Sequence, residues 1–317
     1  MGIGATSEII NITPELGNIG DIVFALGVFD GVHMGHRKLI SDCCEYAKEA
    51  GAKSAIMTFD VDPEEIFGDA STRKLLSNED RISVLSRLGA DMVLVLKFDE
   101  QFSQESPQMF LDTAIRTHMN PLGVYVGCNF RFGHRASGDA RFLKKALGDA
   151  CNVVDEELLC HNGEPVTATR IRDLIENGKL DAANHMLNRM HSMRTRVVKG
   201  RQVGRTIGYP TANLVGLHDY VKPCDGVYAG FIVVEGECYR TSISVGVPKT
   251  FGDIEWTIEA HIIDFDKDIY GEDVTVYFAE YLRPMIKFDS TDALVAQIAA
   301  DTEHAASLPM PEADELL

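Results

Sequence analysis

A continuously apolar segment that runs through a histidine- and glycine-containing turn into an amphipathic helix is the feature that most constrains the fold of this chain. Residues 22–28 read IVFALGV, which fits a strand buried on both faces of a parallel sheet better than a half-exposed strand. Residues 36–50 then place their apolar side chains at helical spacing. Strand followed by helix in this way predicts an α/β N-terminal part with a parallel sheet.

The turn between these segments has the composition of a phosphate-binding loop. Positions 29–36 read FDGVHMGH. The unpaired amides of the helix start attract anions, and Gly35 lets a phosphate approach the main chain. His33 and His36 can donate hydrogen bonds to a phosphate that gains charge during nucleotidyl transfer. The alternative, that both are ordinary loop histidines, would be preferred for a lone His-x-x-His spacing, but the strand, the glycines and the helix together favour the phosphate site.

Apolar and amphipathic segments continue to alternate up to about residue 154. The expected strands cover residues 22–29, 52–59, 91–96, 123–127 and 151–154, and the expected helices cover 36–50, 78–89, 106–118 and 139–147. Two further helices are expected over 169–177 and 181–189. Because ligands of parallel sheets bind beyond the carboxyl ends of the strands, the polar segments that follow these strands are expected to converge there.

Near residue 190 the pattern changes to short segments rich in β-branched and aromatic residues. The expected strands cover 195–199, 227–234, 237–244, 257–264 and 273–279, and a helix is expected over 292–306. Closely spaced strands without intervening helices predict a small antiparallel barrel, here with a terminal helix. We therefore expect two domains, residues 1–186 and residues 187–317.

Composition limits the classes of partner. The chain has 317 residues, enough for two hydrophobic cores, and a formal net charge of −18 argues against a nucleic-acid or membrane-surface partner. Its seven cysteines form no Cys-x-x-Cys pair, so neither a zinc site nor a disulfide framework is expected. Without a leader sequence or a long apolar run, a cytoplasmic protein is expected.

Several motifs, in order along nearly the whole chain, resemble one family. GVFDGVHMGH at 27–36 resembles the signature of the bacterial bifunctional riboflavin kinases and FMN adenylyltransferases, the prokaryotic FAD synthetases, and so do TFD at 58–60, VGCNFRFG at 126–133 and TRIR at 169–172. A second set resembles the riboflavin kinase module: GR at 204–205, GYPTANL at 208–214, GVYA at 226–229, EAH at 259–261 and LR at 282–283. The resemblance implies that riboflavin and ATP give FMN, and that FMN and ATP give FAD, both with Mg²⁺.

The resemblance assigns roles in the first of these sets. His33 and His36 would bind ATP phosphates and serve the adenylyl transfer, and Thr169 and Arg170 would grip the triphosphate from a helix start. The other implied nucleotide-binding residues are Gly27, Phe29, Gly31, Gly35, Asn129 and Arg131, and the implied flavin-binding residue is Asp60. For Asn129, a turn-capping role is an equally good interpretation.

In the second set the resemblance implies that Thr211 and Asn213 hold Mg²⁺ through oxygen atoms. Glu259 would be the base that takes the proton from the ribityl 5′-hydroxyl. The implied nucleotide-binding residues are Gly204, Arg205, Gly208 and Pro210, and the implied flavin-binding residue is Arg283. From spacing alone, Glu259 would more readily be a strand carboxylate paired with Arg283 or His261.

The chain departs from the family pattern at four places. Asp62 stands where the family commonly has a histidine, and Ala168 where it has a serine. The stretch 244–251 differs at residues 247–249 from the family's usual Gly-Thr-Asn-Pro-Thr-Phe, and Met190 and His191 replace a frequent Pro-Tyr. These departures keep two alternatives open: a riboflavin kinase with an impaired adenylyltransferase domain, and a non-catalytic flavin-binding regulator. A nucleotidyltransferase for another substrate is disfavoured, because the kinase motifs would then have no role. The sequence leaves the oligomeric state open.

Overall fold

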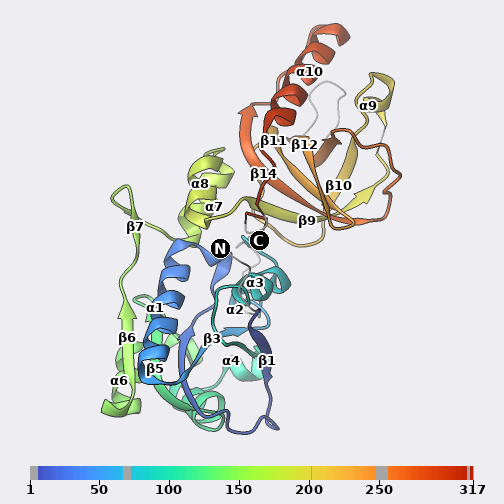
Figure 1. The fold of residues 1–317 in the computed structure, drawn as a ribbon. Helices are drawn as coiled ribbons and strands as arrows, with labels where there is room; N and C mark the ends of the chain where they lie inside the picture. The colour runs from blue at the N-terminus through green and yellow to red at the C-terminus, as the bar shows by residue number, and fades with distance from the viewer. Residues whose placement is uncertain (1–5, 67–72, 201, 247–255, 313–314, 317) are drawn as a thin grey trace. The chain divides into compact units, whose positions relative to one another are not determined.

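The chain forms two compact units, Met1–Thr167 and Ala168–Leu317, in a computed structural model that describes residues 6–66, 73–200, 202–246, 256–312 and 315–316 (Figure 1). Each unit has its own hydrophobic core. The two-domain organisation expected from the change of pattern therefore has a physical counterpart. The boundary between residues 186 and 187 stays a prediction, and by packing the two helices before it group with the second unit.

The first unit is built on a six-stranded parallel sheet with the strand order β1-β4-β3-β2-β5-β6. The strands are β1 (Glu8–Ile12), β2 (Asp21–Leu26), β3 (Lys53–Phe59), β4 (Met92–Leu96), β5 (Asn120–Gly127) and β6 (Asn152–Glu156). The predicted parallel α/β fold is confirmed. In β2, the residues from Ile22 to Leu26 are all buried, as expected for a strand covered on both faces.

The order of the strands creates a switch point beside β2. From β2 the chain proceeds to β3 and β4 on one side, and then crosses to β5 and β6 on the other. The carboxyl ends of β2 and β5, which are neighbours, therefore open into the crevice where parallel sheets bind ligands. The loop after β2 carries the histidine motif, and the loop after β5 carries Asn129 and Arg131.

Helices fill the connections of this sheet. They are α1 (Met34–Ala50), α2 (Pro63–Ile66), α3 (Asn78–Leu85), α4 (Glu100–Ser103), α5 (Pro107–Phe110) and α6 (Ala140–Leu147). Short turns η1 (Asp30–Val32), η3 (His134–Ala136) and η4 (Gly148–Ala150), a π-helical turn η2 (Leu111–Arg116) and a hairpin of β7 (Cys160–His161) and β8 (Glu164–Pro165) complete the unit. The helix expected over 106–118 is thus split, because a wider π turn takes over from α5.

The second unit is a closed antiparallel barrel with the strand order β10-β13-β12-β11-β14-β9, which confirms the predicted fold. Its strands are β9 (His191–Val198), β10 (Ala212–Gly216), β11 (Gly226–Val234), β12 (Glu237–Gly246), β13 (Thr257–Ile262) and β14 (Asp273–Arg283). The short helix α9 (Val203–Thr206) lies between β9 and β10, and α10 (Thr291–Ser307) follows the barrel as expected.

Two helices, α7 (Ala168–Glu176) and α8 (Leu180–Leu187), lead into the barrel. Leu180 belongs to the barrel core. Asn184 fixes α8 to two strands, since its Nδ2 donates to the Phe278 carbonyl at 2.9 Å and its Oδ1 accepts from the His191 amide at 2.7 Å. The helices before the predicted boundary thus take part in the barrel's packing.

Candidate active sites

The start of α1 holds its two histidines as a stacked pair. The His33 side chain caps the helix, its Nδ1 accepting a hydrogen bond from the His36 amide at 3.3 Å. The two rings stack with their centroids 3.6 Å apart and 17° between their planes. The Phe29 ring meets the His36 ring edge-on, with 5.3 Å between the ring centroids. Because Nδ1 of His33 accepts, a neutral His33 carries its proton on Nε2, where it can donate to a ligand.

The His36 ring is uncharged, and one of its nitrogens makes no hydrogen bond to the part of the chain that the structure describes. Its Nδ1 is shielded from solvent and has no hydrogen-bond partner among the described residues. Burial holds the pKa of His36 well below its ordinary value, and the positive charge that His33 can carry lowers it further. An unpaired buried polar atom costs free energy, so this nitrogen of His36 does not stabilise the fold, and its role toward phosphate stays a prediction.

The loop before α1 depends on glycine and on an unusual backbone. A Cβ on Gly35 would lie 3.3 Å from the His33 ring, and a Cβ on Gly27 would lie 3.0 Å from the Phe29 ring. Gly31 has a φ of 71°, and Phe29 adopts the left-handed conformation with a φ of 60°, which is strained for a bulky side chain. Phe29 and Gly35 therefore border the histidine rings directly, whereas Gly27 borders the Phe29 ring.

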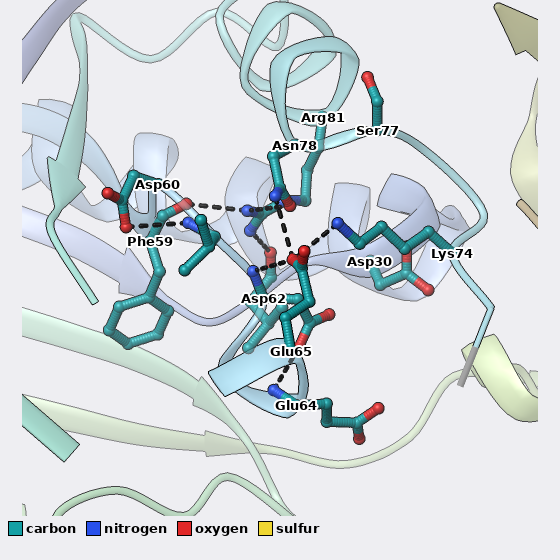
Figure 2. A network of polar contacts seen from close by, with 12 residues as sticks. Asp30, Phe59, Asp60, Asp62, Glu64, Glu65, Lys74, Ser77, Asn78 and Arg81 are labelled. Atoms are coloured by element: carbon teal, nitrogen blue, oxygen red, sulfur yellow. Dashed lines mark hydrogen bonds and ion pairs between the residues drawn. The ribbon is translucent and has the colours of Figure 1, made fainter. Parts of the chain in front are cut away.

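The predicted flavin-binding residue Asp60 holds two loops together through backbone contacts. Its Oδ1 accepts from the Val61 amide at 2.9 Å and from the Phe98 amide at 2.8 Å. Asp62, which stands in place of the family's histidine, caps α2 by accepting from the Glu64 amide at 3.0 Å (Figure 2). A flavin contact by Asp60 stays a prediction.

Asn129 and Arg131 lie in the exposed loop after β5. Asn129 Oδ1 accepts from the Cys128 thiol at 3.3 Å, and Arg131 donates to the Phe130 carbonyl at 2.8 Å. These short local contacts fit the turn-capping interpretation of Asn129. Both residues also stand at the switch point next to β2, so a nucleotide contact stays a prediction.

Thr169 and Arg170 occupy the first turn of α7, as the predicted helix start required. The positive end of the helix dipole points out of this turn, which favours a bound phosphate. Ala168 is the first residue of the helix, and Thr169 is exposed. These residues belong by packing to the second unit, so their role toward the histidine pair stays a prediction.

Three predicted kinase residues meet on the barrel. Thr211 donates from its hydroxyl to Glu259 Oε2 at 3.2 Å. Asn213 pairs with Glu259 across β10 and β13, so their side chains leave the same face of the barrel. The site thus offers a hydroxyl, an amide and a carboxylate oxygen at one place, a donor set that suits a hard cation.

Two glycines let the preceding segment close against these side chains. A Cβ on Gly200 would lie 2.3 Å from the Asn213 amide, and a Cβ on Gly204 would lie 2.2 Å from the Tyr209 carbonyl. Gly208 has a φ of 87°, which a larger residue rarely adopts. Arg205 in α9 and Pro210 are exposed beside this turn. The predicted set is therefore brought together, except for residues 247–249, which lie outside the described residues.

The alternative pairing of Glu259 is wrong for Arg283. Arg283 instead makes a forked ion pair with Asp301 of α10, with Nη2 to Oδ2 at 2.7 Å and Nε to Oδ1 at 3.2 Å. His261 turns its Nδ1 to the Pro210 carbonyl at 2.8 Å. Arg283 thus fixes α10 to β14, and its predicted contact with the flavin stays a prediction.

Sequence reasoning missed Arg81, the largest of the fully buried side chains. Arg81, Val84 and Leu85 are the buried residues of α3, so the arginine occupies the apolar stripe of its helix. An arginine at an apolar-stripe position was the available signal, because a buried guanidinium needs acceptors around it.

Comparison with known proteins covers both units. A family model described as FAD synthetase matches residues 17–170, and one described as riboflavin kinase matches residues 187–308. A bifunctional riboflavin kinase/FMN adenylyltransferase of Listeria monocytogenes is 33% identical over 89% of this chain and 90% of its own length. A bifunctional riboflavin kinase/FMN adenylyltransferase of Bacillus subtilis is 33% identical over 89% of this chain and 91% of its own length.

A solved structure is similar over nearly the full length. It is described as a macrolide-efflux protein from Streptococcus pneumoniae, and it matches with a TM-score of 0.83 and 34% identity over 95% of this chain and 99% of that one. In the part of the chain that the structure describes, no helix is both long and apolar enough to cross a bilayer. The family models and the bifunctional relatives confirm the resemblance seen in the motifs. This chain belongs to the family of bifunctional riboflavin kinases and FMN adenylyltransferases.

Proposed function

We propose that this chain phosphorylates riboflavin to FMN at the barrel and adenylylates FMN to FAD at the parallel sheet, in the cytoplasm and with ATP in both steps. The observation that carries the proposal is that each unit brings together its own set of polar side chains of a kind that suits phosphate or its metal ion. One is the stacked pair of His33 and His36 at a helix start, and the other is the set of Thr211, Asn213 and Glu259.

In the adenylyl transfer, an oxygen of the FMN phosphate attacks the α-phosphorus of ATP as the bond to pyrophosphate breaks. The attacking oxygen is already anionic, so the protein supplies position and charge stabilisation rather than a base. His33 donates from Nε2 and His36 remains neutral, both aimed at phosphate oxygens. Thr169 and Arg170 add a helix start and a guanidinium for the triphosphate.

In the kinase reaction, Glu259 accepts the proton of the ribityl 5′-hydroxyl while that oxygen attacks the γ-phosphorus and ADP leaves. The Thr211 hydroxyl holds the carboxylate in place. Thr211 and Asn213 are the oxygen donors that would hold Mg²⁺, which neutralises phosphate charge when it is bound. Gly200 and Gly204 let the backbone of their segment approach that position.

One observation keeps the second candidate, a kinase with an impaired adenylyltransferase unit. Asp62 replaces a histidine and is used as the cap of α2. It therefore brings negative charge to a region proposed to bind phosphates. If the replacement of the histidine by Asp62 prevents adenylyl transfer, the chain makes FMN but does not convert it to FAD.

Product analysis separates the candidates. The purified chain is incubated with riboflavin, ATP and Mg²⁺, and the flavins are resolved by chromatography. FAD supports the full proposal, FMN alone supports the second candidate, and unchanged riboflavin contradicts both. Chelation of Mg²⁺ in a parallel sample is expected to stop product formation.

A further inference from the structure

We propose that Arg81 is a positioning residue of the adenylyl-transfer site, which sets the loop after β2 against the carboxyl end of β3. The inference rests on the proposed FMN adenylyltransferase activity of the first unit. Arg81 comes from α3 and touches neither the histidine pair nor any residue assigned above to substrate. It acts through the backbone that carries those residues.

The guanidinium of Arg81 connects the loop after β2 to the carboxyl end of β3, and Figure 2 shows its contacts with Phe59 and Asn78. Its Nη1 donates to the Val28 carbonyl and, at 2.8 Å, to the Thr58 hydroxyl. Its Nη2 donates to the Phe59 carbonyl at 2.8 Å and to Asn78 Oδ1 at 3.3 Å. The side chain is only 2% exposed, so water does not replace these contacts.

One acceptor of Arg81, the Val28 carbonyl, is next in sequence to a residue that contacts the histidine pair. Val28 directly precedes Phe29, whose left-handed backbone turns its ring edge onto His36. The Thr58 hydroxyl donates to the same Val28 carbonyl at 3.2 Å, so this carbonyl accepts from both Arg81 and Thr58. A shift of the guanidinium would therefore move the backbone on which the histidine pair depends.

A tight polar network holds the arginine itself. Glu65 of α2 accepts from the Asp62 amide at 2.9 Å, from Lys74 Nζ at 2.6 Å and from Asn78 Nδ2 at 3.0 Å, which ties α2 to the start of α3 (Figure 2). Partial burial acts to raise the pKa of Glu65, but the hydrogen bonds from Lys74 and Asn78 outweigh it and leave the pKa lowered. Glu65 is therefore ionised at neutral pH.

Arg81 stays charged in this network. Burial lowers its pKa from the ordinary value, and the negative charges of nearby carboxylates, first Asp62 and then Asp30, act in the opposite direction. Each hydrogen bond it donates is therefore charge-assisted. Asp30, in η1 of the loop after β2, also accepts from the Leu75 amide at 3.2 Å. This hydrogen bond joins the loop after β2 to the segment before α3.

Helix packing alone does not account for a guanidinium at this position. A buried charge is costly to desolvate, and an apolar side chain of similar volume often gives equal or better stability. The planar fork of arginine reaches acceptors in the loop after β2 and at the end of β3 at once, whereas a lysine ammonium is a single point charge. We infer that the arginine is needed because its fork fixes the position of the loop after β2 relative to the end of β3.

The test compares Arg81→Lys with Val84→Ala in the full-length chain. Val84 lies on the buried face of the same helix, and its apolar side chain makes none of the hydrogen bonds of Arg81, so its truncation weakens the packing of α3 and leaves those polar contacts in place. FAD formation from supplied FMN and FMN formation from riboflavin are measured for both variants, at a temperature at which circular dichroism shows each to be folded.

We expect Arg81→Lys to lower kcat for FAD formation about 10- to 100-fold, with a smaller change in KM and normal kinase turnover. Val84→Ala is expected to lower the unfolding temperature but to keep kcat close to the wild-type value. Equal kcat for the two variants, or equal loss of both activities in Arg81→Lys, would overturn the inference.

Thr58→Val decides the matter if Arg81→Lys does not fold. It removes one acceptor of the guanidinium and keeps the shape of the side chain, so FAD formation should fall while kinase turnover persists. Unchanged FAD formation in Thr58→Val would then overturn the inference. Failure of the proposed function is a separate result, because the wild-type chain itself would make no FAD.

Discussion

Among single residues, burial and hydrogen bonding decide what chemistry each titratable side chain can perform. His36 is kept neutral by burial and retains an unpaired nitrogen beside a helix start, which suits a phosphate donor. Glu259 is only partly buried and accepts from the Thr211 hydroxyl, so one carboxylate oxygen has a fixed partner, and its role as a base stays a proposal. By the same reasoning, the buried His191 affects the stability of the barrel rather than its chemistry.

Replacing Glu259 with glutamine tests its role as base. Glutamine keeps the size of the side chain but not its basicity, so FMN formation from riboflavin should fall on the order of a hundred- to ten-thousandfold. Riboflavin binding, measured by flavin fluorescence, should change little. Near-normal kinase turnover in Glu259→Gln would show that the carboxylate is structural.

The buried His191 makes the barrel sensitive to acid. Burial, assisted by the charge of Arg189, lowers the pKa of His191 from 6.5 to about 3. Because the folded-state pKa lies below the unfolded-state value, unfolding takes up a proton as the pH falls through 6.5 toward 3. This residue therefore costs the barrel about 1.4 kcal/mol of stability per pH unit in that window.

The measurement is urea unfolding of wild type and His191→Phe at pH 7.5 and 5.5. Trp256, the one tryptophan of the chain, packs against the barrel core and reports its unfolding by fluorescence. Between the two pH values the wild-type free energy of unfolding should fall by about 1.4 kcal/mol more than that of the variant. A parallel fall in both proteins would contradict the role given to His191.

At the scale of elements, predictions from sequence succeeded where one local signal fixed the structure. The continuous apolar runs of β2, β3 and β4 gave the sheet, and the polar turn FDGVHMGH gave the helix start. Strand β1 was missed because it is a short segment, EIINI, at the edge of the sheet, and β10 because it is equally short and begins within the PTANL motif.

Contacts between residues distant in sequence could not be predicted. The Asp60 carboxylate meets the Phe98 amide, and Arg283 meets Asp301, only after strands and helices have assembled. The pattern of one segment does not contain the position of the other. The motif residues were found because their short segments resemble the motifs of a known family, whereas the side chains that hold them in place lie outside those motifs.

The segment before β10 offers a test of close backbone approach. Alanine at Gly204 would place a Cβ 2.2 Å from the Tyr209 carbonyl, so the turn must shift away from Thr211. We expect Gly204→Ala to lower kinase turnover up to about 100-fold. Gly216→Ala, whose Cβ would lie 3.4 Å from the nearest atom, is the matched control in β10. Equal kinase rates for the two variants would contradict this account of the turn.

At the scale of the whole molecule, two cores with separate constellations make the activities separable. A fragment of residues 187–317 should fold and phosphorylate riboflavin. The structure adds that a fragment of residues 168–317 should be more stable, because Leu180 packs in the barrel core and Asn184 binds β14 and β9. Thermal unfolding of both fragments, with kinase assays, checks this. A folded but inactive 168–317 fragment would contradict a self-contained kinase unit.

The most direct test of two independent sites in one chain mixes two inactivated full-length variants. His36→Ala removes a phosphate donor worth about 2.7 to 4 kcal/mol of the adenylyl-transfer barrier, so with riboflavin and ATP it should stop at FMN. Glu259→Gln should leave riboflavin unchanged yet convert supplied FMN to FAD. An equimolar mixture is predicted to make FAD from riboflavin, because each variant supplies the step that the other lacks. Loss of both steps in either variant alone, with no FAD from the mixture, would contradict the account.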